Sequence, residues 1–336
     1  MKLTVAQASN LAQRALVAAG YDEEEATLVT EHIIDTELRG LDYGGLARVV
    51  SIFERTTNPG YERAPIEVVH ETPSSALVDG HNTLGYLVAR RASDLCIDKA
   101  SEHGMSVVGA RDTWHTGMLS FFAEMAAERD LVTLIASNAS PNTAPHGGSE
   151  GRFGTNPICF GFPSSDDPVI WDIGTSNIMH GEVVLAQRLG EQIPEGTAYD
   201  AAGNPTRDPT AALAGAFTAW GGHKGSGLAM AVQLLGTMCN VAPIPQGMFG
   251  YGCLFVMMRA DLLMPAQEYK DNVSLYAAEV RKTRPVHGGP AVRMPYDRSL
   301  AERRRRIAAD EIEISDEIHT QISELAQRNS PATGGG

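Results

Sequence analysis

Two side chains occur in contexts that suit chemistry on a small acid. Arg48 lies in RGLDYGGLAR, just after a glycine-bounded turn at the start of a predicted helix. Its planar guanidinium group suits a carboxylate, and an ordinary surface arginine is the alternative. His115, in GARDTWHTG, follows a predicted buried strand, where ligands bind in α/β sheets. An imidazole there can exchange a proton with a substrate, and a hydrogen-bonded structural histidine is the alternative.

The segment from Gly147 to Leu228 has glycine, proline and small hydroxyl residues at the ends of short apolar runs. That composition lets a backbone approach a bulky anion closely. Asp172, Thr175 and Ser176 lie where WDIGTS leaves a predicted strand, and a turn capped by its own hydroxyls is the alternative. Lys224 in GGHKGSG opens a predicted helix, whose first N–H groups favour an anion, and an exposed lysine is the alternative.

These residues together meet the demands of hydride transfer to a 2-oxo acid. The reaction needs a cationic clamp for the carboxylate, a proton donor for the developing alkoxide, and a site for the cofactor pyrophosphate. We therefore predict a nicotinamide-dependent dehydrogenase. Neither G-x-G-x-x-G after the first strand nor a GK[ST] phosphate loop is present, so the cofactor must be bound in another way. His146, His180 and His223 show no metal-ligand spacing, and we expect no metal site.

Composition excludes several other classes of function. The formal charge of −14 and the pI of about 5.1 disfavour nonspecific binding to nucleic acid or anionic membranes. The four cysteines form no CxxC pair and lie in apolar contexts, which predicts buried free thiols in a reducing compartment. The four consecutive arginines at 303–306 have acidic residues on both sides, as on a solvated helix face. With no signal-like or membrane-spanning apolar run, we expect a soluble, cytoplasmic protein.

Apolar periodicity predicts helices at both ends of the chain and an α/β middle. The predicted helices are 5–18, 22–38, 46–55, 84–102, 118–129, 225–238, 266–282 and 316–328. The predicted strands are 66–70, 76–79, 106–110, 131–136, 157–162, 169–172 and 252–258. The three strands between 131 and 172 lack polar alternation, so we expect both faces of the sheet to be covered there. Residues 190–209 form a long loop of a kind that often carries function.

Several segments, in this order and spacing, resemble the malate/L-lactate dehydrogenase family, which is unrelated to the Rossmann lactate dehydrogenases. They are ELRG–LAR, WHTG, SPNTAPHGG, GTNP, WDIGTS, IPEG, NPTRDP, GGHKGSGLA and VRMP. The family includes 2,3-diketogulonate reductase, ureidoglycolate dehydrogenase, sulfolactate dehydrogenase and Δ1-piperideine-2-carboxylate reductase. The resemblance runs from about Leu3 to Arg328.

The resemblance implies an α/β fold with a large mixed β-sheet core that binds NAD or NADP in a non-Rossmann manner. Helical N- and C-terminal regions flank the sheet and help to form a homodimer. We expect residues 1–112 with 285–330 to form the helical substrate and dimerisation lobe. We expect residues 113–284 to form the cofactor-binding sheet core and residues 331–336 to be a disordered tail.

The resemblance also assigns roles by position. Arg48 corresponds to the arginine that binds the substrate carboxylate, and His115 to the histidine taken as acid/base in the ureidoglycolate enzyme. Ser140 and Asn142 lie in the loop over the substrate and the nicotinamide. The positions implied to contact the cofactor are His115, Ile170, Trp171, Asp172, Ile173, Gly174, Thr175, Ser176, His223, Lys224, Asp297 and Arg298.

The chain departs from the family pattern at two places. Many members carry a Ser-His pair where this chain has Tyr43 and Gly44, and that histidine is the proton donor of the diketogulonate enzyme. We therefore expect His115 alone to exchange the proton, with the Tyr43 hydroxyl orienting the substrate, since a phenol is a weak acid near neutral pH. Tyr296 replaces the glycine of the usual PGER segment.

Three functions follow from these residues. The first is an NAD(P)H-dependent oxidoreductase that interconverts a small 2-oxo acid and its 2-hydroxy acid. The second is an NADPH-dependent reductase of a cyclic or N-alkyl 2-imino acid, because a protonated imine makes a missing histidine easier to tolerate. The third is a non-catalytic NAD(P)-binding member of the family. No motif in the sequence selects between NAD and NADP.

Overall fold

The computed structural model describes residues 1–245, 247 and 250–328, and its contacts divide the chain into two compact units. Unit 1 comprises residues 1–63 and 188–190 and the chain from 299 onwards. Unit 2 comprises residues 64–187 and 191–298. The predicted tail at 331–336 lies outside the described residues.

Unit 1 is built from helices. They are α1 (Val5–Ala18), α2 (Glu23–Leu38), α3 (Ala47–Thr56) and α11 (Asp316–Leu325), with β1 (Lys2–Leu3) paired to β11 (Ile312–Glu313). Asp22 accepts a hydrogen bond from the Glu25 amide, and Glu25 accepts one in return, which confirms the predicted capping box. α1 packs against α2, α3 and α11. The large apolar side chains fully buried here include Leu16, Ile33, Leu46 and Ile52.

Unit 2 is organised around a seven-stranded sheet with the order β2-β3-β4-β10-β5-β6-β7. The strands are β2 (Glu67–Glu71), β3 (Ser75–Leu84), β4 (Met105–Trp114), β5 (Leu131–Ser137), β6 (Ile158–Phe162), β7 (Val169–Ile173) and β10 (Tyr251–Arg259). Among these strands β3 and β4 pair in parallel, and the other neighbouring pairs are antiparallel. The predicted mixed sheet is therefore confirmed, and its largely antiparallel order is not that of a Rossmann fold.

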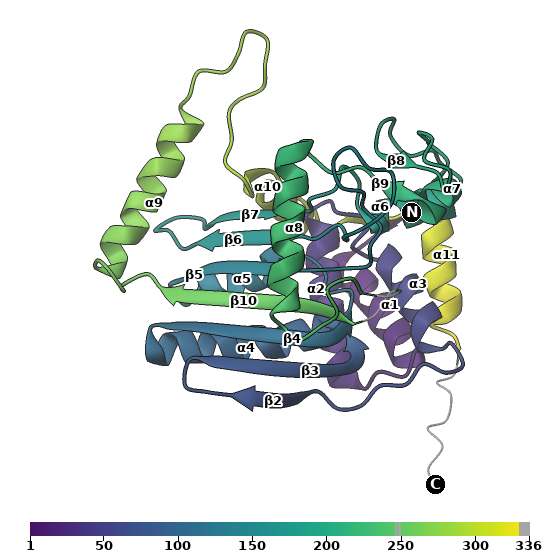
Figure 1. The fold of residues 1–336 in the computed structure, drawn as a ribbon, viewed down its shortest axis with the longest axis horizontal. Coiled ribbons are helices and arrows are strands. Elements are labelled where there is room, and N and C mark those ends of the chain that lie inside the picture. The colour runs from purple at the N-terminus through teal and green to yellow at the C-terminus, as the bar shows by residue number, and fades with distance from the viewer. Residues whose placement is uncertain (246, 248–249, 329–336) are drawn as a thin grey trace. The chain divides into compact units, whose positions relative to one another are not determined.

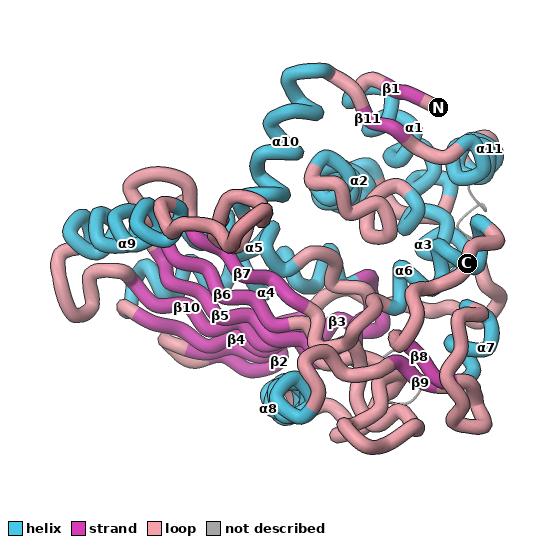
Figure 2. Tube along the Cα trace, turned by 90° about the horizontal axis from the view of Figure 1, so that it is seen from above, coloured by secondary structure: helices cyan, strands magenta, loops and turns pink. Residues whose placement is uncertain are grey.

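Helices cover both faces of the sheet, as the apolar strands predict (Figures 1 and 2). α4 (Gly85–His103) and α5 (Leu119–Ala127) pack on one face, and α8 (His223–Thr237) crosses the other. The core between α4, α5 and the sheet includes Phe122 and Phe255, whose rings meet edge to face. All four cysteines are free and buried, which confirms that prediction.

The rest of unit 2 consists of smaller elements. They are β8 (Ala198–Tyr199) paired with β9 (Ala216–Phe217), α7 (Pro209–Ala214), and α9 (Ala266–Arg281). α6 (His180–Leu189) ends in unit 1, and α10 (Asp297–Ala309) runs from unit 2 into unit 1. α9 lies beyond the ends of the strands in Figure 1, and its buried residue Ala277 packs with Val169 at the start of β7. No helix among the described residues is long and apolar enough to cross a bilayer.

The observed units differ from the predicted lobes at residues 64–112, and also at residues 188–190 and 285–298. The prediction grouped residues 64–112 with the N-terminal helices, but β2, β3 and β4 are strands of the central sheet. The crossover β3–α4–β4 places β4 parallel to β3, and β4 pairs with β10 on its other side. The roles predicted for the lobes stay predictions.

The N-terminus of α4 packs directly on the backbone at the end of β4. A Cβ atom at Gly85 would lie 2.7 Å from the Trp114 carbonyl oxygen and 2.8 Å from that of His115. Real Cβ atoms do not approach backbone so closely, so only glycine fits without displacing the strand end. The geometry of residues 114–115 therefore depends on the absence of a side chain at residue 85.

We expect Gly85→Ala to lower the free energy of unfolding by about 1–3 kcal/mol, because the added methyl group forces the backbone at Trp114 and His115 to move. Urea unfolding would measure the change. Gly227→Ala on α8 is the matched control, since no atom lies within 4 Å of its added Cβ. It should be neutral or stabilising by up to about 1 kcal/mol. Equal stability of the two variants would contradict the close contact.

Candidate active site

His115 lies immediately beyond the C-terminal end of β4 and is half-buried. Its φ of 51° places it in the left-handed region, which is uncommon for residues with a Cβ atom, although histidine, asparagine and aspartate adopt it more often than others. The Trp114 ring meets the imidazole edge on, with 5.3 Å between centroids. Such strain is concentrated at functional sites, and this supports the choice of His115 from the sequence.

The end of β4 is held in place by the neighbouring strand. Trp114 is fully buried and donates from Nε1 to the Asn82 carbonyl at 2.9 Å. The Thr113 hydroxyl donates to the Thr83 carbonyl at 2.8 Å. These bonds fix the two residues before His115 to β3, so the imidazole projects from a rigid element.

Asp172 on β7 forms a hydrogen bond with the helix that follows His115. Its Oδ2 accepts a hydrogen bond of 2.7 Å from the Ser120 amide, in the first turn of α5. Burial raises the pKa of Asp172, and the bonds from Ser120 and Leu119 oppose that shift. The carboxylate is therefore turned onto the helix that follows His115, and its position fixes the start of α5.

Most other side chains of the predicted cofactor stretch also point into the protein. Ile170 is in the core, and the Thr175 and Ser176 hydroxyls donate to the carbonyls of Thr155, Asn156 and Ile178. Trp171 is exposed and stacks on Phe160. Ile173 packs beneath α8, and a Cβ at Gly174 would meet Met179. A ligand at this stretch would therefore meet main chain and the Trp171 ring.

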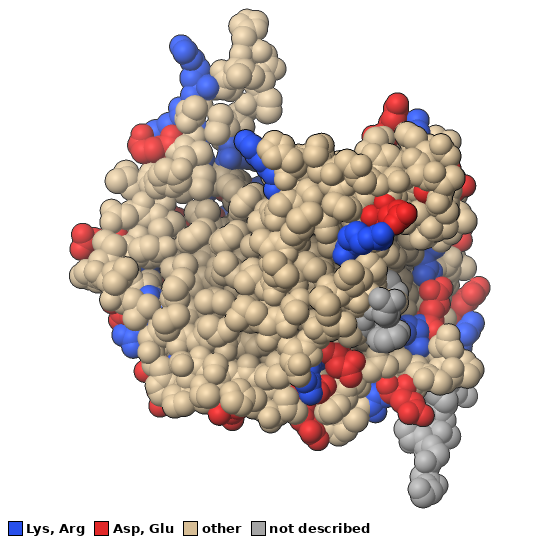
Figure 3. All heavy atoms as spheres, in the orientation of Figure 1, with Lys and Arg blue, Asp and Glu red and all other residues tan. Residues whose placement is uncertain are grey.

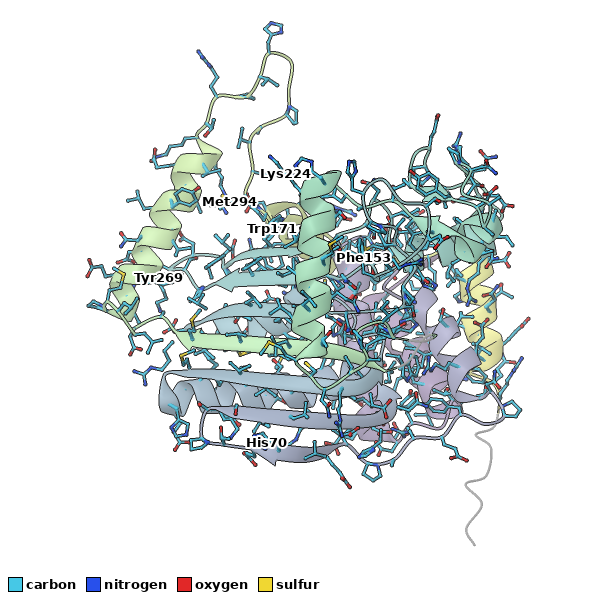
Figure 4. All side chains as sticks on the ribbon, viewed as in Figure 1. His70, Phe153, Trp171, Lys224, Tyr269 and Met294 are labelled. Atoms are coloured by element: carbon cyan, nitrogen blue, oxygen red, sulfur yellow. The ribbon has the colours of Figure 1, made fainter. Side chains whose placement is uncertain are left out.

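The beginning of α8 presents groups that suit an anion. The N-cap is Gly222, with φ of 60°, and it makes no side-chain cap, so the first N–H groups lack a carboxylate or hydroxyl at that position. A Cβ at Gly225 would clash with the Trp220 carbonyl, which shows how tightly the turn is wound. His223 and Lys224 are exposed there, and Figure 4 shows Lys224 at this end of the helix. These residues fit the pyrophosphate of a dinucleotide.

His146 is a residue that sequence reasoning set aside. Its ring lies 6.2 Å from that of His223, and its backbone N–H donates to the Ser226 hydroxyl of α8 at 3.0 Å. The two histidines are 77 positions apart in the sequence, so spacing carried no signal. Only the resemblance, which includes both the SPNTAPHGG and the GGHKGSGLA segments, could have suggested that they lie close together.

The loop with Ser140 and Asn142 is internally bonded. The Ser140 hydroxyl is buried, 2.6 Å from the Tyr251 hydroxyl, and it donates to the Gly247 carbonyl. The Asn142 carbonyl accepts from the Phe217 amide at 2.7 Å, while its side chain is half-buried. Ser140 thus shapes the loop, and Asn142 is the more exposed of the two.

The departure at Tyr296 has a structural cost. Its φ is 78°, a conformation that the glycine of the family pattern adopts freely. The Tyr296 ring packs against the sheet core, which offsets the strain. Asp297 accepts from the Met294 amide and forms a two-pronged ion pair with Arg281, and this lowers its pKa. Arg298 is exposed.

Arg48 belongs to unit 1 and lies in the first turn of α3. Its Nη2 donates to the Tyr43 carbonyl at 3.3 Å, so the guanidinium group lies over the turn that precedes the helix. The Tyr43 side chain is half-buried. Arg48 and Tyr43 are thus brought together within unit 1, and His115, Lys224 and the other sites belong to unit 2.

The turn leaves limited space for a side chain at residue 44. A Cβ there would lie 3.1 Å from Cγ2 of Thr36 on α2, so a histidine side chain would require Thr36 to move slightly. The tight contact is with a single methyl group, while the Leu41 carbonyl oxygen lies at an ordinary contact distance of 3.6 Å. Packing alone therefore does not exclude a side chain at residue 44.

Among the described residues, Asp79, His81 and Asp112 bring possible metal-ligand atoms within 4.8 Å of one another. Arg111 already forms an ion pair with Asp79 at 2.7 Å, which lowers the Asp79 pKa together with the His81 amide. This internal pairing accounts for the cluster.

Comparisons with known proteins agree with this architecture. The family model for malate/L-lactate dehydrogenase matches residues 3–323. L-sulfolactate dehydrogenase of Methanocaldococcus jannaschii is 31% identical, over 91% of each chain. Ureidoglycolate dehydrogenase (NAD(+)) of Escherichia coli O157:H7 is 28% identical, over 98% of this chain and 97% of that one. (2R)-3-sulfolactate dehydrogenase (NADP(+)) of Chromohalobacter salexigens is 35% identical, over 69% and 70%.

Solved structures give the same result. A dehydrogenase from Sinorhizobium meliloti superposes with a TM-score of 0.88 at 28% identity, over 97% of this chain and 98% of that one. Δ1-piperideine-2-carboxylate reductase from Pseudomonas syringae superposes with a TM-score of 0.84 at 28% identity, over 97% and 99%.

We expect Asp172→Ala to lower the free energy of unfolding by about 1–3 kcal/mol, because it removes a buried acceptor from the Ser120 amide. Asp172→Asn keeps an acceptor and, since burial already disfavours the charge, should cost less. Hydrogen exchange at the Ser120 amide would locate the effect at α5. Unchanged protection of that amide in Asp172→Ala would show that the bond does not hold the helix.

Proposed function

Because the chain belongs to the malate/L-lactate dehydrogenase family, we propose that it is an NAD(P)-dependent oxidoreductase that interconverts a small 2-oxo acid and its 2-hydroxy acid. The observation that carries this proposal is the half-buried imidazole of His115, held in a left-handed conformation at the end of β4. Residues with this strain are concentrated at functional sites, and the end of a strand is where ligands bind in α/β sheets.

Each residue of the candidate substrate site has its own part in the proposed reaction. When bound, NAD or NADP would provide the hydride chemistry at C2 of the substrate. Arg48 binds the carboxylate through its planar fork, and His115 gives a proton to the oxygen at C2 during reduction and takes it back during oxidation. Tyr43, next to Arg48, orients the substrate. Ser140 and Asn142 belong to the loop that covers the substrate.

NAD or NADP is bound by unit 2. Lys224, His223 and the first N–H groups of α8 bind its phosphates, and the strand end from Ile170 to Ser176 contributes main chain and the Trp171 ring. Asp297 and Arg298 complete the predicted contacts, with Asp297 acting through its position beside Arg281.

A second substrate class, cyclic or N-alkyl 2-imino acids, is favoured by Gly44. A protonated imine already carries the positive charge that hydride addition needs, so a site with one histidine fewer still reduces it. The resemblance to Δ1-piperideine-2-carboxylate reductase supports this alternative.

We also propose that the protein is a cytoplasmic homodimer. α9 and its flanking loops expose large apolar side chains, as an interface between copies requires. These are Leu262, Leu263, Leu275, Tyr276 and Val286. α8 adds a second exposed row, Met230, Leu234 and Met238. Figure 3 shows few charged side chains in the middle of the face that α8 crosses.

A substrate panel tests the reaction. With NADH and NADPH in turn, the enzyme should oxidise cofactor in the presence of pyruvate, oxaloacetate or longer 2-oxo acids, measured by absorbance at 340 nm. Faster turnover with Δ1-piperideine-2-carboxylate would select the imine reductase. Cofactor binding with no oxidation across the whole panel would leave the non-catalytic family member.

His115→Asn should lower kcat by about 10²–10⁴-fold, because it removes the proton donor. Asparagine is chosen because it accepts the left-handed backbone that His115 adopts. The variant should still bind the cofactor, which nicotinamide fluorescence would measure. Turnover close to the parent value would remove His115 from the chemistry.

A further inference from the structure

The turn that leads into α3 has no cap from its own residues. The Gly44 and Gly45 amides donate to the Leu41 carbonyl at 2.8 and 3.1 Å, and the N-cap Leu46 provides no side-chain acceptor. Arg48 follows two residues later. The orientation of the arginine therefore depends on whatever holds the Leu46 amide.

Glu37 on α2 holds that amide. Its Oε2 accepts from the Leu46 N–H at 2.7 Å, and its side chain is only 2% exposed. A Cβ atom at Gly45 would lie 1.9 Å from the same oxygen, so the carboxyl group occupies the space that a side chain at residue 45 would need. The carboxyl group and the turn are therefore in close contact, and only glycine fits at residue 45.

Arg306 on α10 contacts both the backbone and the carboxyl group of Glu37. Its Nη1 donates to the Glu37 carbonyl at 2.8 Å and lies 4.0 Å from Oε1 of the carboxyl group. Glu302 pairs with Nε of Arg306 at 2.7 Å, and Asp42 lies 3.9 Å from Nη1. The backbone of α2 at Glu37 is therefore fixed to α10 while the carboxyl group faces the turn.

We propose that Glu37 is a positioning residue for substrate binding: its buried carboxyl group fixes the turn that carries Arg48, and so aims the guanidinium group at the substrate carboxylate. This inference rests on the proposed role of Arg48. Glu37 itself contacts neither substrate nor cofactor in this scheme.

The protonation state of Glu37 gives the role a measurable signature. Burial raises its pKa to about 8, against the opposing effect of the Leu46 hydrogen bond. The charged groups that face it are Asp42, which raises the pKa further, and Arg306, which lowers it. Below this pKa the group is neutral. Above it, the hydrogen bond from the Leu46 amide is stronger, but the buried negative charge repels a carboxylate ligand, so KM for the substrate should rise.

The experiment compares two variants of the full-length protein. Glu37→Leu removes the acceptor for the Leu46 amide and should raise KM for a 2-oxo acid roughly tenfold, with a smaller effect on kcat and on cofactor affinity. Glu37→Gln keeps an acceptor but cannot ionise. It should have the parent KM at pH 7 and lack the increase in KM that the parent shows between pH 7 and 9.

Glu31→Gln is the matched control, since Glu31 lies exposed on the same helix and undergoes the same chemical change. Its KM should follow the parent at every pH. If Glu37→Leu does not fold, the pH profile of Glu37→Gln decides, because that variant keeps the hydrogen bond. A profile identical to that of the parent would overturn the proposal.

Arg48→Lys separates this inference from the proposed function. A lysine cannot reproduce the two-pronged bond, so KM should rise while kcat changes less. An increased KM in Arg48→Lys, with both Glu37 variants like the parent, would refute the role of Glu37 alone. An unchanged KM in Arg48→Lys would refute the clamp, and the role of Glu37 with it.

Discussion

The close contact between the start of α4 and the end of β4 is the constraint on which unit 2 depends. β4 is central in the sheet, paired in parallel with β3 and antiparallel with β10. Gly85 admits the Trp114 and His115 backbone because it has no side chain. The left-handed conformation of His115 follows from this packing together with the bonds of Trp114 and Thr113 to β3. Sheet stability thus compensates for strain at the candidate catalytic residue.

Two buried carboxyl groups perform the same task in different units. Asp172 accepts from the first turn of α5, which follows His115, and Glu37 accepts from the amide that leads into α3 and Arg48. Burial raises the pKa of both. A carboxyl oxygen in this position accepts from an N–H group at the start of a helix, which has no acceptor within the helix. Both candidate catalytic groups therefore stand next to a helix start that a distant residue fixes.

The sequence predicts the elements well because apolar periodicity and caps are local signals. The Asp22–Glu25 box, the helix at Val5–Ala18 and the apolar strands covered on both faces are all confirmed. Long-range contacts carry no such signal. The sequence placed Asp172 in a cofactor stretch through its motif, but its bond to Ser120, 52 residues away, was beyond reach. Likewise the left-handed backbone of Tyr296 depends on packing against the core.

The four cysteines of unit 2 are all buried, and burial raises the pKa of each thiol. Cys96, Cys159 and Cys253 lie in the core cluster on the face of the sheet that α4 and α5 cover, and the Cys239 side chain approaches Gly109 of β4. Alkylating reagents react with exposed thiolates, so these sulfurs become modified only in molecules whose sheet has transiently opened. The rate at which they are modified therefore measures the transient opening of unit 2. It gives no information on the helices of unit 1, which contain no cysteine.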